Sequence, residues 1–261
     1  MSQILFDFES PNVITYNKLD SSSLEIKKLI KEGEASNGLI VWAKEQTDGY
    51  GRYGKNWDSS GKGNLTFSFM VENDRTPELV AIYPFIAALA IKDAMNVFLT
   101  KEQSQKISFK WPNDILFDGK KFAGIILESE IQNNQISHII CGIGVNITSS
   151  PKGLNFATSL QEEGIKNINL KQLLHYIVTN FEQYLNIANL KGDQEIYDSW
   201  LKYAHNLNEE IIIISNQEEV KGIFQGIENG NLIVSQEGQE NKVFFTGDVF
   251  FSEEEMITTA A

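Results

Sequence analysis

One arginine stands among three glycines in the stretch GYGRYGKNW, residues 49–57. Gly49, Gly51 and Gly54 let backbone N–H groups come close to a ligand, because no Cβ intervenes. Arg52 adds a permanent, forked positive charge that suits a carboxylate or a phosphate. The stretch therefore fits an anion-binding loop, although glycine spacing alone fits a flexible hairpin loop with an incidental arginine equally well.

Two lysines lie on either side of a predicted turn in FKWPNDILFDGKKFAG, residues 109–124. Lys110 precedes a Trp-Pro step that stiffens the backbone, and Lys121 follows an Asp-Gly pair that is typical of a tight β-hairpin. Such a hairpin can bring both ammonium groups to one ligand. The alternative is that both lysines are solvated at the surface and that Asn113 and Asp114 are turn formers.

The stretch CGIGVNI, residues 141–147, interrupts a predicted strand with two glycines. Gly142 and Gly144 indicate either a close approach by a ligand or another backbone, or a β-bulge. Asn146 carries an amide that can bond a sugar or phosphate group. Cys141 is expected to be a small buried apolar residue, with a nucleophilic role as the alternative. The three histidines show no metal-ligand spacing.

Local signals predict a sheet that holds these stretches. A buried strand is expected at 39–43, and alternating apolar residues at 64–71 predict a half-buried strand. The glycine-arginine stretch therefore lies in a loop between two strands. A hairpin turning at Asp118-Gly119 and a strand at 138–147 follow.

Helices are expected to pack on one face of this sheet. The serines at 21–23 predict a helix start, and Gly33 predicts its end. A second helix is expected from Thr76 to about Leu99, kinked or restarted at Pro84. Apolar residues at helical spacing predict two more helices, at about 170–185 and around Trp200.

The chain changes its pattern near Asn208, where short strands separated by turns such as Asn229-Gly230 predict a small β-barrel module. We therefore expect a catalytic domain at 1–207 and a barrel domain at 208–261.

Composition narrows the class of protein. The 261 residues include 35 acidic and 22 basic side chains, and the net charge of -13 argues against a protein whose main task is to bind nucleic acid. No run approaches the ~18 apolar residues of a membrane span, and the N-terminus lacks the basic start of a signal peptide. A single cysteine fits a reducing compartment. A soluble, cytoplasmic protein is expected.

Taken in this order, the three stretches resemble the motifs of the biotin protein ligases. EQTDGYGRYGKNW is similar to the family's glycine-arginine loop, KWPNDILFDGKKFAG to its lysine hairpin and GIGVNI to its third motif. The similarity runs from about Lys18 into the C-terminal module. The resemblance implies an α/β domain of the α+β type, with a mixed sheet like that of the class II aminoacyl-tRNA synthetases and helices on one face, followed by a small SH3-like β-barrel.

The resemblance also implies an activity: biotin and ATP form biotinyl-5'-AMP, and the biotinyl group moves to a lysine of a biotin carboxyl carrier protein. Adenylation brings a carboxylate to an α-phosphate, so fixed cations and Mg²⁺, held through the ATP phosphates, must offset the repulsion of two anions. Arg52, Lys110 and Lys121 are the expected catalytic cations. Lys110 matches the lysine that meets the biotin carboxylate and the α-phosphate, and Lys121 matches one that faces the ATP phosphates.

The resemblance assigns the remaining ligands in the same way. Neutral donors and acceptors are needed for the ureido ring of biotin, and Trp57 matches an aromatic residue over the adenine, with a plain core residue as the alternative. The glycine loop is expected to order over the reactive adenylate as a lid. The expected biotin site contains Ser21, Ser22, Ser23, Gln46, Tyr50, Gly51, Arg52, Lys110 and Gly124, and the expected ATP site contains Arg52, Trp57, Asn113, Lys121 and Asn146.

Two positions depart from the family pattern. Ser21-Ser22-Ser23 stands for the usual Ser-Thr-Asn, and Tyr50 stands for the first arginine of Gly-Arg-Gly-Arg, so both are expected to retune the biotin site. The ligase motifs begin within about 20 residues of Met1. The N-terminal DNA-binding domain of many relatives is therefore not expected, in agreement with the acidic charge. The resemblance leaves a homodimer through a sheet edge open and does not identify the acceptor protein.

Three rival functions are weaker. Lipoate ligases and octanoyltransferases share the fold and acylate a carrier lysine, and Cys141 as a nucleophile would favour transfer, but KWPND and the Gly-Arg loop favour biotin. A binding module, with the barrel as an adaptor on an inactive scaffold, is opposed by the three intact cationic positions. A DNA-binding regulator is the weakest of the three.

Overall fold

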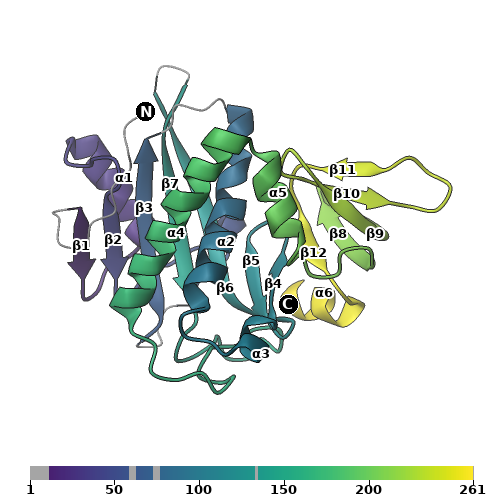
Figure 1. The fold of residues 1–261 in the computed structure, drawn as a ribbon, viewed down its shortest axis with the longest axis horizontal. Coiled ribbons are helices and arrows are strands. Elements are labelled where there is room, and N and C mark those ends of the chain that lie inside the picture. Colours follow the sequence, from purple (N-terminus) through teal and green to yellow (C-terminus); the bar gives the residue numbers. More distant parts are fainter. Residues whose placement is uncertain (1–11, 59–62, 73–76, 133–134, 261) are drawn as a thin grey trace.

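A mixed seven-stranded sheet forms the centre of the computed structural model, which describes residues 12–58, 63–72, 77–132 and 135–260. Its strands are β1 Val13–Tyr16, β2 Ile40–Ala43, β3 Leu65–Glu72, β4 Ile107–Lys110, β5 Asp114–Phe117, β6 Lys120–Gln132 and β7 Gln135–Val145. They lie in the order β1-β2-β3-β7-β6-β5-β4 (Figure 1). β1 and β2 pair in parallel and the other neighbours are antiparallel, which confirms the predicted mixed sheet.

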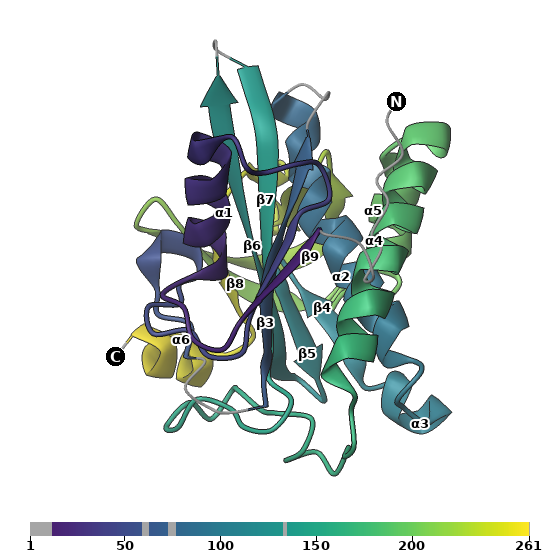
Figure 2. The ribbon, with the colours of Figure 1, turned by 90° about the vertical axis from the view of Figure 1, so that its left-hand side faces the viewer.

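Helices lie on both faces of the sheet (Figure 2). They are α1 Ser22–Glu32, α2 Tyr83–Met95, α3 Lys101–Ser104, α4 Leu170–Lys191 and α5 Gln194–Leu201, with the short 3₁₀ helices η1 Arg52–Gly54 and η2 Pro77–Ile82. The expected helical layer on one face contains α2, α4 and α5. α1 lies on the opposite face and packs against β2, β3 and β7, an arrangement that the prediction of helices on one face does not include.

β3 is buried on both faces, whereas its alternating pattern predicted a half-buried strand. Phe67 and Phe69 are buried in the large core beneath α2 and α4. Met70 packs with Ile26 of α1 in a second, smaller core, and Ser68 is fully buried. The prediction was wrong because the strand's own residues cannot show that a helix from another part of the chain covers the second face.

The helix predicted from 76 to 99 consists of two elements. Its expected cap, Thr76, lies outside the described residues. η2 is followed by α2, which has Pro84 in its first turn, so the predicted restart is confirmed. α2 ends at Met95 rather than at about Leu99, because Phe98 and Leu99 pack against the core from beyond the end of the helix.

The hairpin between β5 and β6 turns at Asp118 and Gly119, which both have positive φ, as predicted for an Asp-Gly turn. The strand predicted at 138–147 is β7, which starts earlier, at Gln135, and ends at Val145. β7 occupies the middle of the sheet, between β3 and β6.

A five-stranded antiparallel sheet follows as the C-terminal module, as predicted. Its strands are β8 Glu210–Ser215, β9 Glu218–Glu228, β10 Asn231–Ser235, β11 Lys242–Phe244 and β12 Asp248–Phe250, and α6 Glu253–Ala260 comes after them. The Asn229-Gly230 turn touches the first domain, because the indole Nε1 of Trp111 donates to the carbonyl of Gly230 at 3.0 Å. The boundary after residue 207 remains a prediction. Within the described ranges, no helix has both the length and the apolar character needed to cross a bilayer.

Phe181 of α4 joins the helical layer to the sheet. Its ring meets Phe69 edge-on, with centroids 4.7 Å apart, and stacks beside Tyr83 at 6.1 Å. Phe181→Ala is expected to lower the free energy of unfolding by about 3–5 kcal/mol, because it leaves a cavity in a fully buried site. Leu190→Ala, in the same helix but 86% exposed, is the control, with an expected change below about 0.5 kcal/mol. Urea unfolding measures the free energy of unfolding of both variants. A loss for Phe181→Ala as small as that for Leu190→Ala would contradict this packing.

Candidate active site

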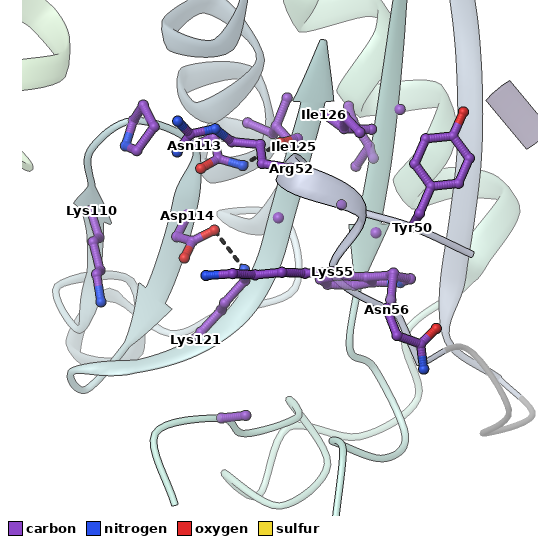
Figure 3. Close-up of a pocket in the computed structure, with 18 of the residues that line it drawn as sticks. Tyr50, Arg52, Lys55, Asn56, Lys110, Asn113, Asp114, Lys121, Ile125 and Ile126 are labelled. Atoms are coloured by element: carbon purple, nitrogen blue, oxygen red, sulfur yellow. Dashed lines mark hydrogen bonds and ion pairs between the residues drawn. The ribbon is translucent and has the colours of Figure 1, made fainter. Parts of the chain in front are cut away.

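A cavity of about 680 Å³ opens beside the sheet, between the start of α1, the glycine-arginine loop and the hairpin of β5 and β6. Every predicted ligand except Asn146 lines it: Ser21, Ser22, Ser23, Gln46, Tyr50, Gly51, Arg52, Trp57, Lys110, Asn113, Lys121 and Gly124. In Figure 3, Lys110 and Lys121 lie toward one side of this cavity and Tyr50 toward the other. The structure thus brings together residues that are up to about a hundred positions apart in the sequence.

One end of the cavity is built from small neutral polar groups. The Oε1 atom of Gln46 accepts from the backbone N–H of Ser22 at 2.7 Å and from its hydroxyl at 2.9 Å. The hydroxyls of Ser22 and Ser23 lie 2.7 and 2.8 Å from the hydroxyl of Ser68. Ser21 caps α1, so the helix start fixes the serines in place. Such neutral donors and acceptors suit a neutral polar ring.

The glycine-arginine stretch forms a short loop that closes on itself. The N–H of Trp57 donates to the carbonyl of Gly49 at 2.8 Å, and the N–H of Gly51 donates to the carbonyl of Lys55 at 2.7 Å. Because its glycines carry no side chain, the backbone of the loop can lie close to the cavity. These backbone hydrogen bonds therefore close the loop.

Tyr50 anchors this loop to the sheet. Its hydroxyl donates to the carboxylate of Glu128 on β6, at 3.0 and 3.2 Å to the two oxygens, and Lys27 of α1 pairs with Glu128 at 2.6 Å. Burial, followed by the Glu128 charge, raises the pKa of the Tyr50 hydroxyl, so it stays a neutral donor. The residue that replaces the expected arginine thus has a defined structural contact.

Arg52 faces the C-terminal module. Its guanidinium donates to the carbonyl of Gly247 and to the hydroxyl of Thr246, each at 3.1 Å, and lies 3.8 Å from a carboxylate oxygen of Asp248. Lys55 pairs with the same carboxylate at 2.7 Å. The predicted anion-binding group is therefore held at the rim of the cavity by protein acceptors.

Each lysine of the hairpin pairs with a carboxylate. Lys121 lies 2.6 Å from Asp114, the pair that Figure 3 marks with a dashed line. Lys110 forms an ion pair with Glu255 of α6. Asn113 lines the cavity and donates its amide to the carbonyl of Ile125, so it also ties β5 to β6. Neither lysine is a freely solvated surface residue, which removes that alternative.

The glycines of the third motif make room for side chains. A Cβ on Gly144 would lie 2.2 Å from the ring of Trp57, and one on Gly124 would lie 3.0 Å from it. A Cβ on Gly142 would come within 2.6 Å of Ile126. β7 pairs with β3 and β6 in unbroken register through both of its glycines, so the β-bulge alternative was wrong. The close approach that was expected from a ligand or backbone is made by Trp57.

Asn146 is placed away from the cavity. It is buried, its amide donates to the carbonyl of Thr158 at 3.2 Å, and its backbone N–H donates to the carbonyl of Phe122 at 2.7 Å. These contacts fix the loop that follows β7. Its side-chain oxygen Oδ1 has no hydrogen-bond partner among the described residues, and its predicted role in ATP binding stays a prediction.

Among the residues that line the cavity, sequence reasoning did not predict Ser68, Asp114, Asp248 and Glu255. The alternating pattern of β3 assigned Ser68 to an outward face. Asp114 was treated as a turn former. Asp248 and Glu255 lie in the C-terminal module, far along the chain, where isolated acidic residues carry no local signal.

Cys141 is fully buried in β7, and burial raises the pKa of its thiol, so the nucleophile alternative is disfavoured. We expect iodoacetamide to leave the folded protein unmodified and to alkylate it fully in urea. Intact-mass measurement reads the result directly, because the chain has a single cysteine. Rapid stoichiometric alkylation of the folded protein would contradict the buried placement.

Comparisons with known proteins agree with this geometry. Residues 17–146 match the Biotin/lipoate A/B protein ligase family, and residues 207–252 match the Biotin protein ligase C terminal domain. The biotin--[acetyl-CoA-carboxylase] ligase of Paracoccus denitrificans is 30% identical over 240 residues, which cover 90% of this chain and 98% of that protein. The bifunctional ligase/repressor BirA of Escherichia coli is 26% identical, covering 90% of this chain and 73% of its own length.

A solved structure supports the same relationship. The biotin protein ligase from Aquifex aeolicus, in complex with biotin and ATP, superposes with a TM-score of 0.75 at 25% identity, covering 92% of this chain and 98% of that one. Both parts of the chain, the mixed sheet and the C-terminal module, therefore have counterparts in one family. The chain belongs to the biotin protein ligases.

Proposed function

We propose that this chain is an ATP-dependent biotin protein ligase that forms biotinyl-5'-AMP and transfers the biotinyl group to a lysine of a biotin carboxyl carrier protein. The observation that carries the proposal is a single cavity with a neutral polar end at the serines and Gln46 and a cationic end at Lys110 and Lys121. The neutral polar end matches the ureido ring of biotin. The cationic end matches the biotin carboxylate and the phosphates of ATP. The names of the relatives and of the Aquifex aeolicus complex support the same ligands.

The first step joins two anions. An oxygen of the biotin carboxylate bonds to the α-phosphorus of ATP, and the bond to pyrophosphate breaks. Lys110 offsets the charge where the carboxylate and α-phosphate meet, and Lys121 offsets charge on the departing phosphates. Arg52 acts at the rim, where the loop closes over the adenylate and keeps water out.

The second step consumes the adenylate. The unprotonated ε-amine of an acceptor lysine attacks the acyl carbon, AMP leaves with the bonding electron pair, and the amide nitrogen loses a proton. The closed loop has to admit this one amine while it excludes water, and the anchoring of Tyr50 to Glu128 limits how far the loop opens.

Each end of the cavity has its own recognition chemistry. Ser22, Ser23 and Gln46 fit the ureido ring of biotin, which needs donors and acceptors without charge. Trp57 lies over Gly144 of β7 and Gly124 of β6 and offers a ring face to the adenine. A side chain at Gly144 or Gly124 would crowd the ring.

Mg²⁺ is expected to arrive with ATP. The described residues contain no cluster of three or more His, Cys, Asp or Glu side chains that would hold a metal by themselves. Asp114 lines the cavity next to Lys121, and one carboxylate together with substrate phosphates is a usual Mg²⁺ ligand set. When bound, the ion supplies positive charge to the phosphate oxygens.

The wider context is also proposed. The partner is a biotin carboxyl carrier protein, nucleic acid is not a partner, and the setting is the cytoplasm. Residues 1–207 form the catalytic domain and 208–261 the SH3-like barrel domain. β1 lies at an edge of the main sheet and is one surface through which two copies can pair.

ATP–pyrophosphate exchange tests the proposed activity, with biotin, lipoate and octanoate offered separately. Exchange that depends on biotin alone is expected. Exchange with lipoate or octanoate would favour the sister class of ligases, and the absence of exchange with every acid would favour a non-catalytic binding module.

Substitutions at two glycines of β7 test the two ends of the cavity independently. Gly144→Ala forces Trp57 away, so we expect it to weaken ATP binding by roughly 1–3 kcal/mol, the value of one base–aromatic stack, and to leave biotin binding intact. Gly142→Ala crowds Ser23 and Ile126, so we expect about a 10- to 200-fold loss of biotin affinity with ATP binding intact. Calorimetric titration of each ligand alone measures both. The reverse pattern, or equal losses of both ligands, would contradict the assignment of the two ends.

A further inference from the structure

The cationic end of the cavity is closed by a carboxylate from the last helix. Glu255 of α6 is 7% exposed, forms the ion pair with Lys110, and accepts from the backbone N–H of Phe251 at 2.8 Å. The rings of Phe250 and Phe251 flank the ammonium group, with centroids 5.4 and 4.9 Å away. Three groups from the C-terminal module thus lie around the ammonium group of Lys110.

This contact lies outside the shared C-terminal domain. The match to the Biotin protein ligase C terminal domain ends at residue 252, and α6 begins at Glu253. Glu255 therefore lies outside the matched residues, on the lysine that the proposed function assigns to the substrate anions.

The charges around Lys110 determine whether Glu255 and the substrates can occupy the site together. With the biotin carboxylate and the α-phosphate in place, Glu255 would be a third anion at one ammonium group in a site of low dielectric constant. Like charges at contact distance repel strongly there, and a buried carboxylate that loses its partner is unfavourable. Glu255 and the substrate anions therefore exclude one another at Lys110.

α6 is eight residues long and lies next to β12 (Figure 1). Among its described side chains, only Glu255 is buried. Most of its described side chains are exposed, including Ile257, and the ion pair between Glu253 and Lys221 is at the surface, where such pairs contribute little. Glu255 is the buried polar contact that fixes the helix over the cavity, so replacing that contact with a ligand anion releases the helix.

We infer that Glu255 is an internal competitor for the substrate carboxylate and phosphate: α6 closes the cationic end of the ligand-free enzyme, and the anions displace it from Lys110. The inference rests on the proposed function, because it needs Lys110 to be the anion-binding lysine. It makes Glu255 a residue that sets the affinity for biotin and ATP without taking part in bond formation.

Glu255→Gln removes the competing charge while keeping a side chain of the same shape. We expect the KM for biotin in ATP–pyrophosphate exchange to fall by about 5- to 150-fold, the usual range of coupling between two sites, with kcat unchanged. Glu253→Gln, on the same helix but in the surface pair, is the matched control and is expected to keep the KM of the unaltered chain. Thermal unfolding of both variants checks that they fold.

Hydrogen exchange on the unaltered chain gives a second reading. Biotin with ATP is expected to speed amide exchange across residues 253–260. An equal KM in the two variants, a higher KM in Glu255→Gln, or unchanged exchange in α6 would each overturn the inference while leaving the ligase activity standing. No biotin-dependent pyrophosphate exchange in the unaltered chain would instead overturn the proposed function, and the inference with it.

Discussion

The site depends on buried or partly buried cationic side chains in a protein that is acidic overall. Unpaired ammonium and guanidinium groups at a partly buried cavity are unfavourable, so each proposed cation has an acid of the protein beside it: Lys121 with Asp114, Lys110 with Glu255, and Arg52 with Asp248. In the function that we propose, substrate anions enter a site whose charges are already balanced. Binding would then exchange protein carboxylates for the carboxylate of biotin and the phosphates of ATP.

The two parts of the chain meet at the cavity and both supply charged groups to it. The mixed sheet positions Lys110 on β4 and Lys121 on β6, the strands on either side of β5, and the C-terminal module supplies Asp248 and Glu255 to the same space. Arg52 reaches from the glycine loop to the carbonyl of Gly247 and so links the loop to that module. The C-terminal module thus contributes to the cavity, and both the glycine loop and Lys110 contact it.

Features of the site that depend on adjacent residues could be predicted from the sequence. The glycine-arginine loop, the Asp-Gly hairpin and the serine cap of α1 are set by a few adjacent residues, and all three were predicted. Ser68 was missed because alternation in one strand does not reveal a covering helix. The close contact of Gly144 with Trp57 joins residues 87 positions apart, and the pairing of Lys110 with Glu255 joins residues 145 apart, so neither leaves a local pattern.

The most direct test of the account is single-turnover formation of biotinyl-5'-AMP by the unaltered chain and by Lys110→Gln, with the enzyme in excess over biotin. The account predicts a rate about 10²- to 10³-fold lower in the variant, the usual cost of losing one group that stabilises developing charge, in a protein that folds normally. Equal rates would show that Lys110 does not carry the charge where carboxylate and phosphate meet, and would contradict the account.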